Sequence, residues 1–357
     1  MLRRRLSKKI KSCVSFVLCF VMVCTSFVFI PASTKASAAT FANGADVSWV
    51  PAMENAGYVW YNKAGVKTDI LKILRDDYGM NTIRLRVFVN PSGDAGNGWC
   101  DTANTVAMAK RANALGMNVI VDFHYSDSWA DPGQQTIPAA WSSYTVDQLY
   151  TAVYNFTYYV MNQLKSAGVT PTYAQIGNET NDGMLWPYGK ASTSSTTMKQ
   201  YANFVTSGYN AVKAVSSSTK VIVHLANGDQ TSLYTWNIGG LVNNGAKFDV
   251  VGLSLYPTES NYSSLLSSCA TTMSTIKSTY NKPVMIMECG MQYSSASTCK
   301  TFISSLITKV KALGSGTYGL GVLYWEPEAY SGWNGYTMGA WAKNGKASVA
   351  LDAFIGQ

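Results

Sequence analysis

Histidine is scarce in this sequence, and its cysteines are not spaced for metal binding. Only His124 and His224 occur in 357 residues, and none of the seven cysteines belongs to a C-x-x-C pair. Structural and catalytic zinc sites combine several of these residues at short spacings. We therefore expect no metal site.

Signature motifs of several enzyme classes are also missing. There is no P-loop, no G-x-S-x-G turn and no H-E-x-x-H motif. The segment "GSGTYG", from Gly314 to Gly319, has the letters of a dinucleotide-binding loop, but it follows a predicted helix and opens a predicted strand. A dinucleotide site needs the opposite order, because the pyrophosphate rests on a helix N-terminus. We expect no cofactor.

Most of the chain lacks an excess of charge of either sign. The formal net charge is +8, but residues 1–39 hold seven of the 28 basic residues and none of the 20 acidic ones. Residues 40–357 therefore carry 21 basic and 20 acidic side chains. A nearly neutral domain has no electrostatic attraction for nucleic acid, so we expect no nucleic-acid partner.

Residues 1–39 are predicted to be a secretory signal peptide. A basic segment precedes an apolar run from Cys13 to Ile30, and "KASAA" offers a cleavage site after Ala38 or Ala39. The apolar run is long enough to span a bilayer, so a retained membrane anchor is the alternative. We expect a secreted, extracellular protein that is monomeric and leaves the membrane once the signal is cleaved.

Four cysteines remain beyond this segment: Cys100, Cys269, Cys289 and Cys299. Four cysteines allow three pairings, and the sequence decides none of them. One or two disulfides would be compatible with export, but a domain of this size does not need them.

Short β-branched segments alternate with amphipathic helical patterns after Thr40, as they do in βα units of a parallel sheet. The predicted strands are residues 43–49, 81–88, 118–124, 172–178, 220–226, 248–256, 283–289 and 319–325. The predicted helices are residues 67–78, 101–115, 145–167, 198–215, 262–280 and 299–313, with a less regular pattern over 230–245.

Eight such units in residues 40–357 fit one (β/α)8 TIM barrel, an α/β fold of this size. A doubly wound open sheet is the alternative. No Pro-rich or Gly-rich linker divides the segment, so we expect a single catalytic domain.

Unusual polar residues stand near the carboxyl ends of the predicted strands, where TIM barrels carry their reactive groups. Along the chain they are Asp46, Ser48, Arg84, Arg86, Asp122, His124, Asn178, Glu179, His224, Asn227, Tyr256, Glu288, Trp325 and Glu326. A single strand-end carboxylate is usually a helix cap or an ion-pair partner. Charges inside apolar runs such as "PVMIMEC" are costly unless they are paired or used, so the joint pattern indicates an active site.

Glu179 and Glu288 end the fourth and seventh strands, roughly opposite each other across the barrel mouth. Two carboxyl groups facing one cleft are the machinery of glycoside hydrolysis. One must keep its proton near neutral pH while the other stays ionised. Arg84 near Glu288 favours the charged form there, and apolar, amide-lined surroundings favour the protonated form of Glu179.

Tryptophans beside the strand ends suit a sugar ligand. Trp129, Trp186, Trp325 and Trp333 lie in or next to the expected strand-end loops, where indole faces stack on pyranose rings. Packing beneath the loops is the alternative role for each of them.

Two long segments carry a resemblance to a known family. "VDFHYSDSWADPGQQTIPAAW" (residues 121–141) and "QIGNETNDGMLWPYG" (residues 175–189) closely resemble the arabinogalactan endo-β-1,4-galactanases of glycoside hydrolase family 53. The likeness continues in "GADVSW", "NTIRLRVFVNP", "HLANG", "VVGLSLYP", "PVMIMECG" and "YWEP". The resemblance implies a (β/α)8 barrel of the large clan of retaining glycosidases. In that clan the acid/base lies on strand four and the nucleophile on strand seven.

The resemblance also implies individual roles. Glu179 matches the acid/base and Glu288 the nucleophile. Arg84 matches an arginine beside the nucleophile, Asn178 an asparagine that binds the sugar 2-hydroxyl, Tyr256 a tyrosine that holds the nucleophile, and Trp325 a platform under the −1 sugar. Further substrate-binding positions are expected at Asp46, Arg86, His124, Asp127, Trp129, Trp186 and His224.

Two positions depart from the family pattern. The segment "CGMQYSSASTC", from Cys289 to Cys299, is short and contains no acid, whereas some members bind a structural calcium in longer loops. Cys289 also stands after the predicted nucleophile, where the family more often has threonine. No calcium site is expected here, and the packing beside Glu288 is left open.

The predicted partner is β-1,4-galactan, the side chain of pectic type I arabinogalactan. Double displacement at this polymer requires the two carboxyl groups to lie roughly 5–5.5 Å apart. Two alternatives stay open: a barrel hydrolase acting on another β-1,4-glycan such as mannan or xylan, and a carbohydrate-binding protein built on an inactive barrel.

Overall fold

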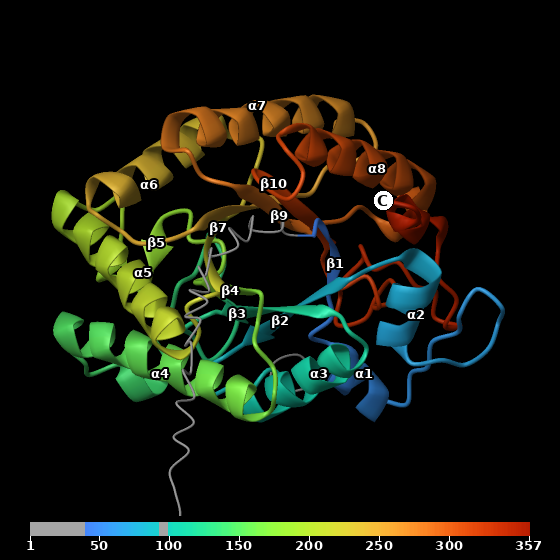
Figure 1. The fold of residues 1–357 in the computed structure, drawn as a ribbon, viewed down its shortest axis with the longest axis horizontal. Helices are drawn as coiled ribbons and strands as arrows, with labels where there is room; N and C mark the ends of the chain where they lie inside the picture. The colour runs from blue at the N-terminus through green and yellow to red at the C-terminus, as the bar shows by residue number, and fades with distance from the viewer. Residues whose placement is uncertain (1–39, 93–98) are drawn as a thin grey trace, which may run out of the picture. The chain divides into compact units, whose positions relative to one another are not determined.

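Eight parallel strands form a closed barrel in the computed structural model, which describes residues 40–92 and 99–357 (Figure 1). The strands are β1 (Ala42–Asp46), β2 (Thr82–Val87), β3 (Asn118–Phe123), β4 (Tyr173–Ile176), β7 (Lys220–Leu225), β8 (Val250–Leu255), β9 (Val284–Cys289) and β10 (Gly319–Tyr324). They pair in chain order, and β10 closes the barrel on β1. The predicted (β/α)8 fold is confirmed, and closure rules out the open sheet.

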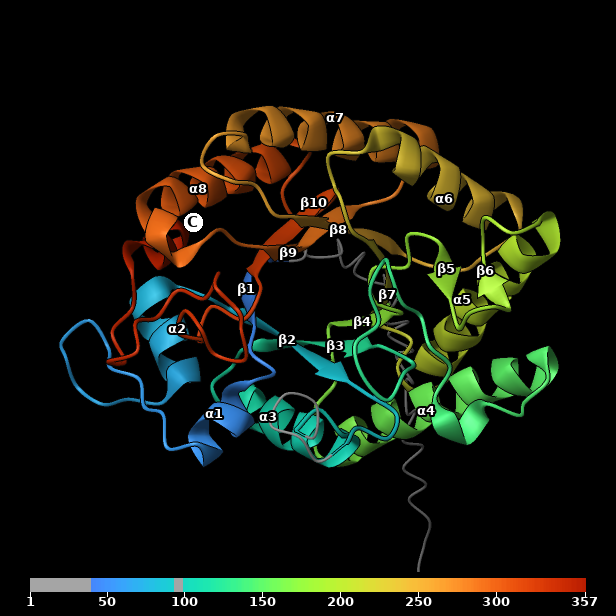
Figure 2. The same cartoon turned by 180° about the vertical axis from the view of Figure 1, so that it is seen from behind.

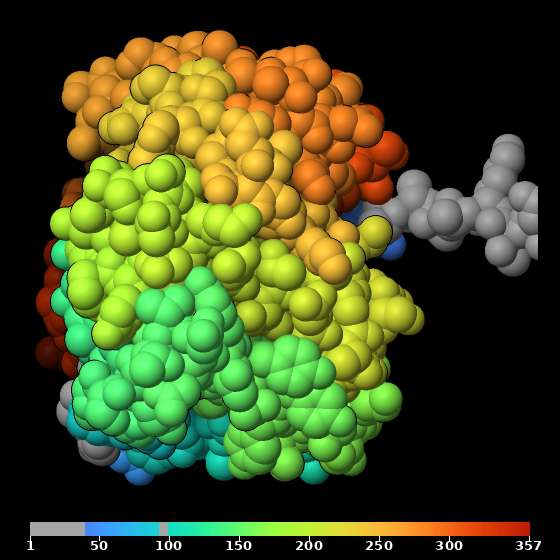
Figure 3. All heavy atoms as spheres, turned by 90° about the vertical axis from the view of Figure 1, so that its left-hand side faces the viewer, coloured from blue at the N-terminus to red at the C-terminus, as the bar shows by residue number. Residues whose placement is uncertain are grey.

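Helices surround the barrel in Figures 1 and 2. They are α1 (Val50–Asn55), α2 (Ile70–Tyr78), α3 (Thr102–Ala114), α4 (Val146–Ser166), α5 (Ser195–Val215), α6 (Thr231–Asn243), α7 (Tyr262–Tyr280) and α8 (Ala296–Ala312). The long helices α4 and α5 pack side by side and, with α6, form the closely packed outer surface in Figure 3. Each predicted helix is present, including the one over 230–245.

Local sequence signals explain where helices begin and end. Asp69 caps α2 by accepting hydrogen bonds from the backbone of Leu71 and Lys72. The same helix ends at Gly79, whose φ of 71° is left-handed and directs the chain into β2. Thr145 and Gln148 form a capping box that starts α4.

The eighth unit departs from the repeating pattern. After β10 no α-helix follows; the chain makes a series of turns and ends in a short 3-10 helix, η3 (Val349–Phe354), packed against α8 and α2. The segment "SGWNGYTMGAWAKNGKAS" is rich in glycine and turn-forming residues, which disfavour a helix. The sequence also did not predict α1, the 3-10 turns η1 (Ala139–Trp141) and η2 (Tyr293–Ser295), or the hairpin of β5 (Gly183–Met184) and β6 (Gly189–Lys190).

The barrel interior changes from apolar to polar along the strands. One buried cluster fills the first part of the barrel with Ala42, Ile120, Tyr173, Ile222, Val250, Met285, Met287, Leu320 and Leu323. Further along, the inward side chains are Asp46, Arg84, Asp122, Gln175, His224 and Glu288, all buried. Buried polar groups must satisfy one another, so this second layer has to form a connected network.

All four described cysteines are buried and free. None of the three pairings left open by the sequence forms. Cys289 packs with its thiol donating to the carbonyl of Leu323 at 3.2 Å, which settles the packing beside Glu288.

The predicted signal peptide, residues 1–39, lies outside the described residues. Among the helices of residues 40–92 and 99–357, none is long and apolar enough to cross a membrane.

Candidate active site

Glu179 and Glu288 line one cavity of about 630 Å³ at the carboxyl ends of the strands. An oxygen of Glu179 lies within 4.8 Å of an oxygen of Glu288. Glu179 follows β4 with a φ of 44°, a left-handed conformation that residues other than glycine rarely adopt. Such strain is concentrated at functional sites, where the surrounding structure imposes it.

A shift of register brings a serine next to the two carboxyl groups. Leu253 of β8 pairs with Ile286 of β9, but the next residue, Ser254, pairs with Glu288. The extra residue on β9 is Met287. Bulges of this kind redirect side chains near active sites, and here Ser254 and Glu288 both face the cavity.

Arg84 is the centre of the buried polar layer. Its Nη1 donates to Glu288 Oε1 at 2.9 Å and to Asp46 Oδ2 at 2.8 Å. Its remaining donors go to Asp122, Asn178 and Gln175 at 2.8, 2.9 and 3.0 Å. A guanidinium has five N–H groups, so every one of them is used. Arg84 therefore holds four strands in one geometry and places a positive charge against Glu288.

The second oxygen of Glu288 is also held. Tyr256 Oη donates to Oε2 at 2.8 Å. With one oxygen bound by Arg84 and the other by Tyr256, the carboxylate has a fixed orientation toward the cavity.

Glu179 has a different environment. Burial and the negative charge of Glu288 raise the pKa of Glu179 to about 8, whereas a hydrogen bond that Ser254 Oγ donates to the ionised Oε1, 2.7 Å away, acts in the opposite direction. The two carboxyl groups are thus unequal: the raised pKa favours the protonated form of Glu179, and Glu288 faces a guanidinium.

Four partners hold the side chain of Asn178. Its Oδ1 accepts from Arg84, from Gln175 Nε2 at 3.1 Å and from His224 Nδ1 at 3.0 Å. Its Nδ2 donates to the carbonyl of Ala130 at 2.8 Å. One amide N–H is left for another acceptor at the cavity wall.

Each histidine occupies a defined position. His124 lines the cavity, with Nδ1 accepting from the backbone of Ala130 at 3.1 Å, which leaves the proton on Nε2 to donate to Asp122 at 3.0 Å. His224 lies beneath the wall with its two ring nitrogens next to Asn178 and Ser254. Burial and the charge of Arg84 lower the pKa of His224 well below its ordinary value, so its imidazole is neutral.

Aromatic side chains form one side of the cavity. Trp129 and Trp325 both line it, with ring centroids 6.0 Å apart. Arg86 lies behind them, 4.5 Å from the centroid of Trp129, and is paired with Glu326 and Asp46. This buried ion cluster supports the indoles from below.

The predicted site residues therefore fall into three groups. Those that line the cavity are His124, Trp129, Asn178, Glu179, Tyr256, Glu288 and Trp325. Those buried beneath it are Asp46, Arg84, Arg86 and His224. Asp127 and Trp186 do not line it.

We expected the second and third groups to bind substrate, and for these residues that stays a prediction. Asp46, Arg84, Arg86 and His224 contact other protein groups and have almost no exposed surface. Asp127 holds its loop by accepting from the backbone of Asn90 and Ala139.

Trp186 and Trp333 also serve the loops. Trp186 donates to the carbonyl of Asp182 at 2.8 Å, and the ammonium of Lys190 lies 4.8 Å from its ring. Trp333 packs against Tyr330. Both tryptophans have the packing contacts that the sequence analysis named as an alternative, and binding of sugar by Trp186 stays a prediction.

Sequence reasoning did not single out several cavity residues, among them Asp131, Asp229, Ser254 and Tyr336. Ser254 had a detectable signal, because it precedes Tyr256 by two residues in the predicted strand 248–256 and so shares its face. Tyr336 had none, because it comes from the long turn segment after β10.

Glu179, His224 and Glu288 lie close enough together to be compared with a metal site. Both nitrogens of His224 and at least one oxygen of each glutamate already have hydrogen-bond partners. The donor set therefore fits a hydrogen-bonded network better than an ion.

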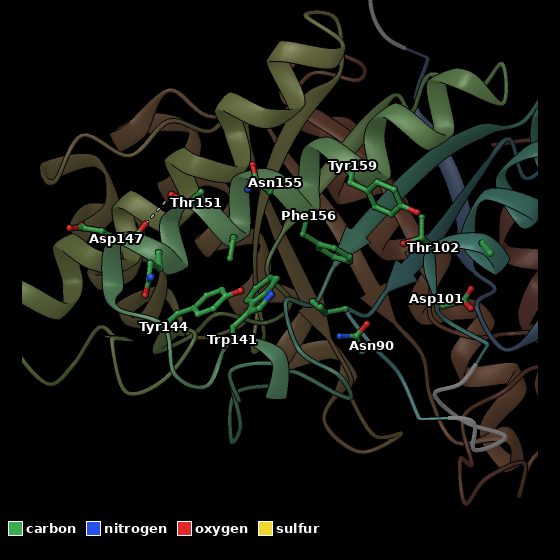
Figure 4. A pocket seen from close by; sticks show the side chains of 14 residues that line it. Asn90, Asp101, Thr102, Trp141, Tyr144, Asp147, Thr151, Asn155, Phe156 and Tyr159 are labelled. Atoms are coloured by element: carbon green, nitrogen blue, oxygen red, sulfur yellow. Dashed lines mark hydrogen bonds between the residues drawn. The ribbon is translucent and has the colours of Figure 1, made fainter.

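A larger hollow of about 970 Å³ lies elsewhere, between α4 and the segments before α3 and α4 (Figure 4). Figure 4 shows Trp141, Tyr144 and Phe156 along it. Of its carboxylates, Asp101 caps α3 and Asp147 lies in the first turn of α4. Both of its carboxylates thus lie at helix starts, whereas the smaller cavity holds the adjacent pair Glu179 and Glu288.

Known proteins are similar to this chain in sequence. The sequence is 34% identical over 334 residues to a probable arabinogalactan endo-β-1,4-galactanase A of Neosartorya fischeri, covering 86% of this chain and 87% of the relative. It is also 34% identical to an arabinogalactan endo-β-1,4-galactanase of Thermothelomyces thermophilus over 310 residues, covering 80% and 88% of the two chains.

Solved structures are also similar to this chain. A fungal β-1,4-galactanase superimposes with a TM-score of 0.80 at 30% identity, covering 89% of this chain and all of the other. The family 53 catalytic domain of Ignisphaera aggregans gives a TM-score of 0.78 at 30% identity, covering 88% and 95%. A xylanase A core matches at 0.59 with 14% identity, which shows a common fold alone. Residues 42–354 match glycosyl hydrolase family 53, and the chain belongs to that family.

Proposed function

We propose that this protein is an endo-β-1,4-galactanase that cleaves galactan, including the side chains of type I arabinogalactan, with retention of anomeric configuration. The observation that carries the proposal is the Glu179–Glu288 pair, with oxygens within 4.8 Å of each other in one cavity. Retaining glycosidases place their carboxyl groups about 5–5.5 Å apart, whereas inverting enzymes leave roughly 6.5–9.5 Å for a water molecule.

The first step forms a covalent sugar–enzyme ester. Glu288 attacks the anomeric carbon with a carboxylate oxygen while Glu179 gives its proton to the leaving glycosidic oxygen. Arg84 and Tyr256 hold both oxygens of Glu288 and orient the attack. The raised pKa of Glu179 supplies the proton at neutral pH.

The second step releases the sugar. Glu179, now ionised, takes a proton from a water molecule, whose oxygen attacks the anomeric carbon and displaces Glu288. Each displacement inverts the anomeric centre, so the two together retain its configuration.

The cavity wall provides sugar contacts. Trp325 and Trp129 offer indole faces to a pyranose, and the free amide N–H of Asn178 offers a donor to the 2-hydroxyl next to the reacting carbon. The named relatives act on β-1,4-galactan within arabinogalactan, which supports the same polymer here. Since one chain supplies every residue of the site, we further propose that the protein acts as a monomer.

We also propose that residues 1–39 direct export, giving an extracellular enzyme whose catalytic domain is residues 40–357. The proposal rests on the basic segment, the apolar run and the cleavage sequence "KASAA". Mass spectrometry of the protein recovered from culture medium tests it.

Reducing-sugar release from β-1,4-galactan, mannan and xylan tests the substrate, with Glu288→Ala as the control. Release from galactan alone supports the proposal. Preferential release from mannan or xylan would assign another β-1,4-glycan. Galactan binding without any release would favour a binding protein.

A further inference from the structure

Three buried side chains extend from Glu179 into the protein. Ser254 Oγ lies 2.7 Å from Glu179 Oε1, and the same oxygen lies 2.8 Å from His224 Nε2. His224 Nδ1 lies 3.0 Å from Asn178 Oδ1. A continuous row of hydrogen-bonding atoms therefore connects the acid/base candidate to the amide beside it.

The inner end of this row has a fixed direction. Asn178 donates through Nδ2 to the carbonyl of Ala130, so the atom facing His224 is the carbonyl oxygen, which also accepts from Arg84. An oxygen that only accepts requires His224 to carry its proton on Nδ1. In the neutral imidazole, Nε2 is then an acceptor and needs a donor.

Ser254 has one hydroxyl proton for two neighbours. If Glu179 is ionised, its Oε1 and His224 Nε2 are both acceptors for that one proton, and donation to Glu179 leaves the fully buried Nε2 of His224 without a donor. If Glu179 is protonated, it donates to Ser254 Oγ, and Ser254 donates to His224, so every group is satisfied. Leaving a buried acceptor unsatisfied is costly, so the row favours the protonated acid.

We propose that Ser254 and His224 are positioning residues that form a relay holding Glu179 in its protonated, donating state. This inference rests on the proposed role of Glu179 as acid/base. When Glu179 gives up its proton, the Ser254 hydroxyl turns from His224 to the new carboxylate, and it turns back when Glu179 recovers a proton from water. No other group gains or loses a proton.

Neighbouring charges keep the relay in this state. The groups that face Glu179 are Arg84, Asp131, Tyr234, Tyr256 and Glu288. Those that face His224 are Arg84 and His124. Because Arg84 is fully charged and lies on the same asparagine oxygen as His224, a second positive charge on the imidazole is disfavoured.

A double-mutant cycle tests the relay. The quantity measured is kcat/KM on β-1,4-galactan as a function of pH, whose fall at alkaline pH (the alkaline limb) reports the loss of the proton from Glu179. His224→Asn keeps a donor near the position of Nδ1 and removes the Nε2 acceptor. Ser254 can then donate to Glu179 permanently, which favours ionisation. We expect the limb to move to lower pH by roughly one unit, the shift expected when one protonation state gains a single hydrogen bond.

In the Ser254→Ala variant, adding His224→Asn should not shift the alkaline limb further. Without the serine hydroxyl, no hydrogen bonds connect His224 to Glu179. His124→Asn is the matched control, since His124 has no contact with Ser254; any shift it causes should be equal in both backgrounds. A His224→Asn shift of equal size with and without Ser254, or a shift to higher pH, would overturn the relay.

Titration of the Glu179 carboxyl carbon by ¹³C NMR gives the same comparison without turnover. It separates failure of the relay from failure of the proposed function: absence of galactan cleavage in the wild type rejects the function, whereas a Glu179 titration unaffected by His224→Asn rejects the relay. If His224→Asn does not fold, the carboxyl titration of Ser254→Ala against Ser254→Thr decides, with only the hydroxyl-bearing variant expected to match the wild type.

Discussion

Arg84 contacts Glu288 at 2.9 Å, and both side chains are almost fully buried. The same guanidinium also binds Asp122 and Asp46, the latter shared with Arg86. The position of the proposed nucleophile thus depends on Arg84 together with Tyr256.

Replacing Arg84 by methionine should therefore destabilise the fold. The change removes the buried cation from Glu288 and Asp122 and leaves Asp46 with Arg86 alone, which we expect to lower the free energy of unfolding by about 3–5 kcal/mol. Urea denaturation measures it. Arg111→Met is the matched control, because its pairs with Glu54 and Asp69 are partly exposed and should be worth less than about 1 kcal/mol. Equal losses in the two variants would contradict the role given to Arg84.

Alanine at each glutamate should have different consequences. Glu179→Ala should lower kcat on galactan by about 10²–10⁴-fold but retain much more activity on an aryl galactoside whose leaving group needs no proton. Glu288→Ala should lose activity on both substrates, because no covalent ester can form. Steady-state kinetics on the two substrates checks this. Recovery of Glu288→Ala on the aryl substrate would reverse the assignment.

Glu179→Gln should stabilise the folded protein at alkaline pH. Burial and Glu288 raise the pKa of Glu179 from its ordinary 4.5 to about 8, so the folded state binds this proton more tightly than the unfolded chain does. Wild-type stability is therefore lost as pH rises from about 4.5 to 8. Glutamine, which does not ionise, avoids the loss. We expect equal stability at pH 4 and an advantage of about 2–5 kcal/mol at pH 9. Denaturation curves at both pH values measure it, and an advantage that is largest at pH 4 would contradict the raised pKa.

Reducing agents should not change thermal stability. Cys100, Cys269, Cys289 and Cys299 are free and buried, and burial raises the pKa of the Cys269 thiol to about 12 and of the Cys100 thiol to about 11. These thiols should resist alkylation in the folded protein and all react after unfolding, which mass spectrometry counts. A native disulfide is typically worth about 2–5 kcal/mol, so a clear fall of Tm under reduction would show that one exists.

The regular part of the fold was predictable from sequence because buried strands and amphipathic helices have distinct periods. All eight strands and the seven helices predicted are present among the described residues. The turn segment after β10 (residues 331–348) could not be predicted, because its glycines and aromatic residues do not recur at a regular spacing. Its Tyr336 reaches the cavity through tertiary packing alone.

The sequence also could not predict which strand-end side chains line the cavity and which lie beneath its wall. Strand ends correctly marked Glu179 and Glu288 as cavity residues, but Arg86 and His224 follow the same pattern and lie beneath the wall. The register shift that aligns Ser254 with Glu288 has no signal in the letters of either strand. The contact of Ser254 with Glu179, which follows β4, appears only in the folded barrel.

The anomeric form of the first product tests the central claim most directly. ¹H NMR of galactan hydrolysis at early times distinguishes the anomers before mutarotation mixes them. Two displacements through Glu288 predict that the β-anomer appears first. Initial release of the α-anomer would mean a single displacement by water, and would contradict the double displacement proposed for Glu179 and Glu288.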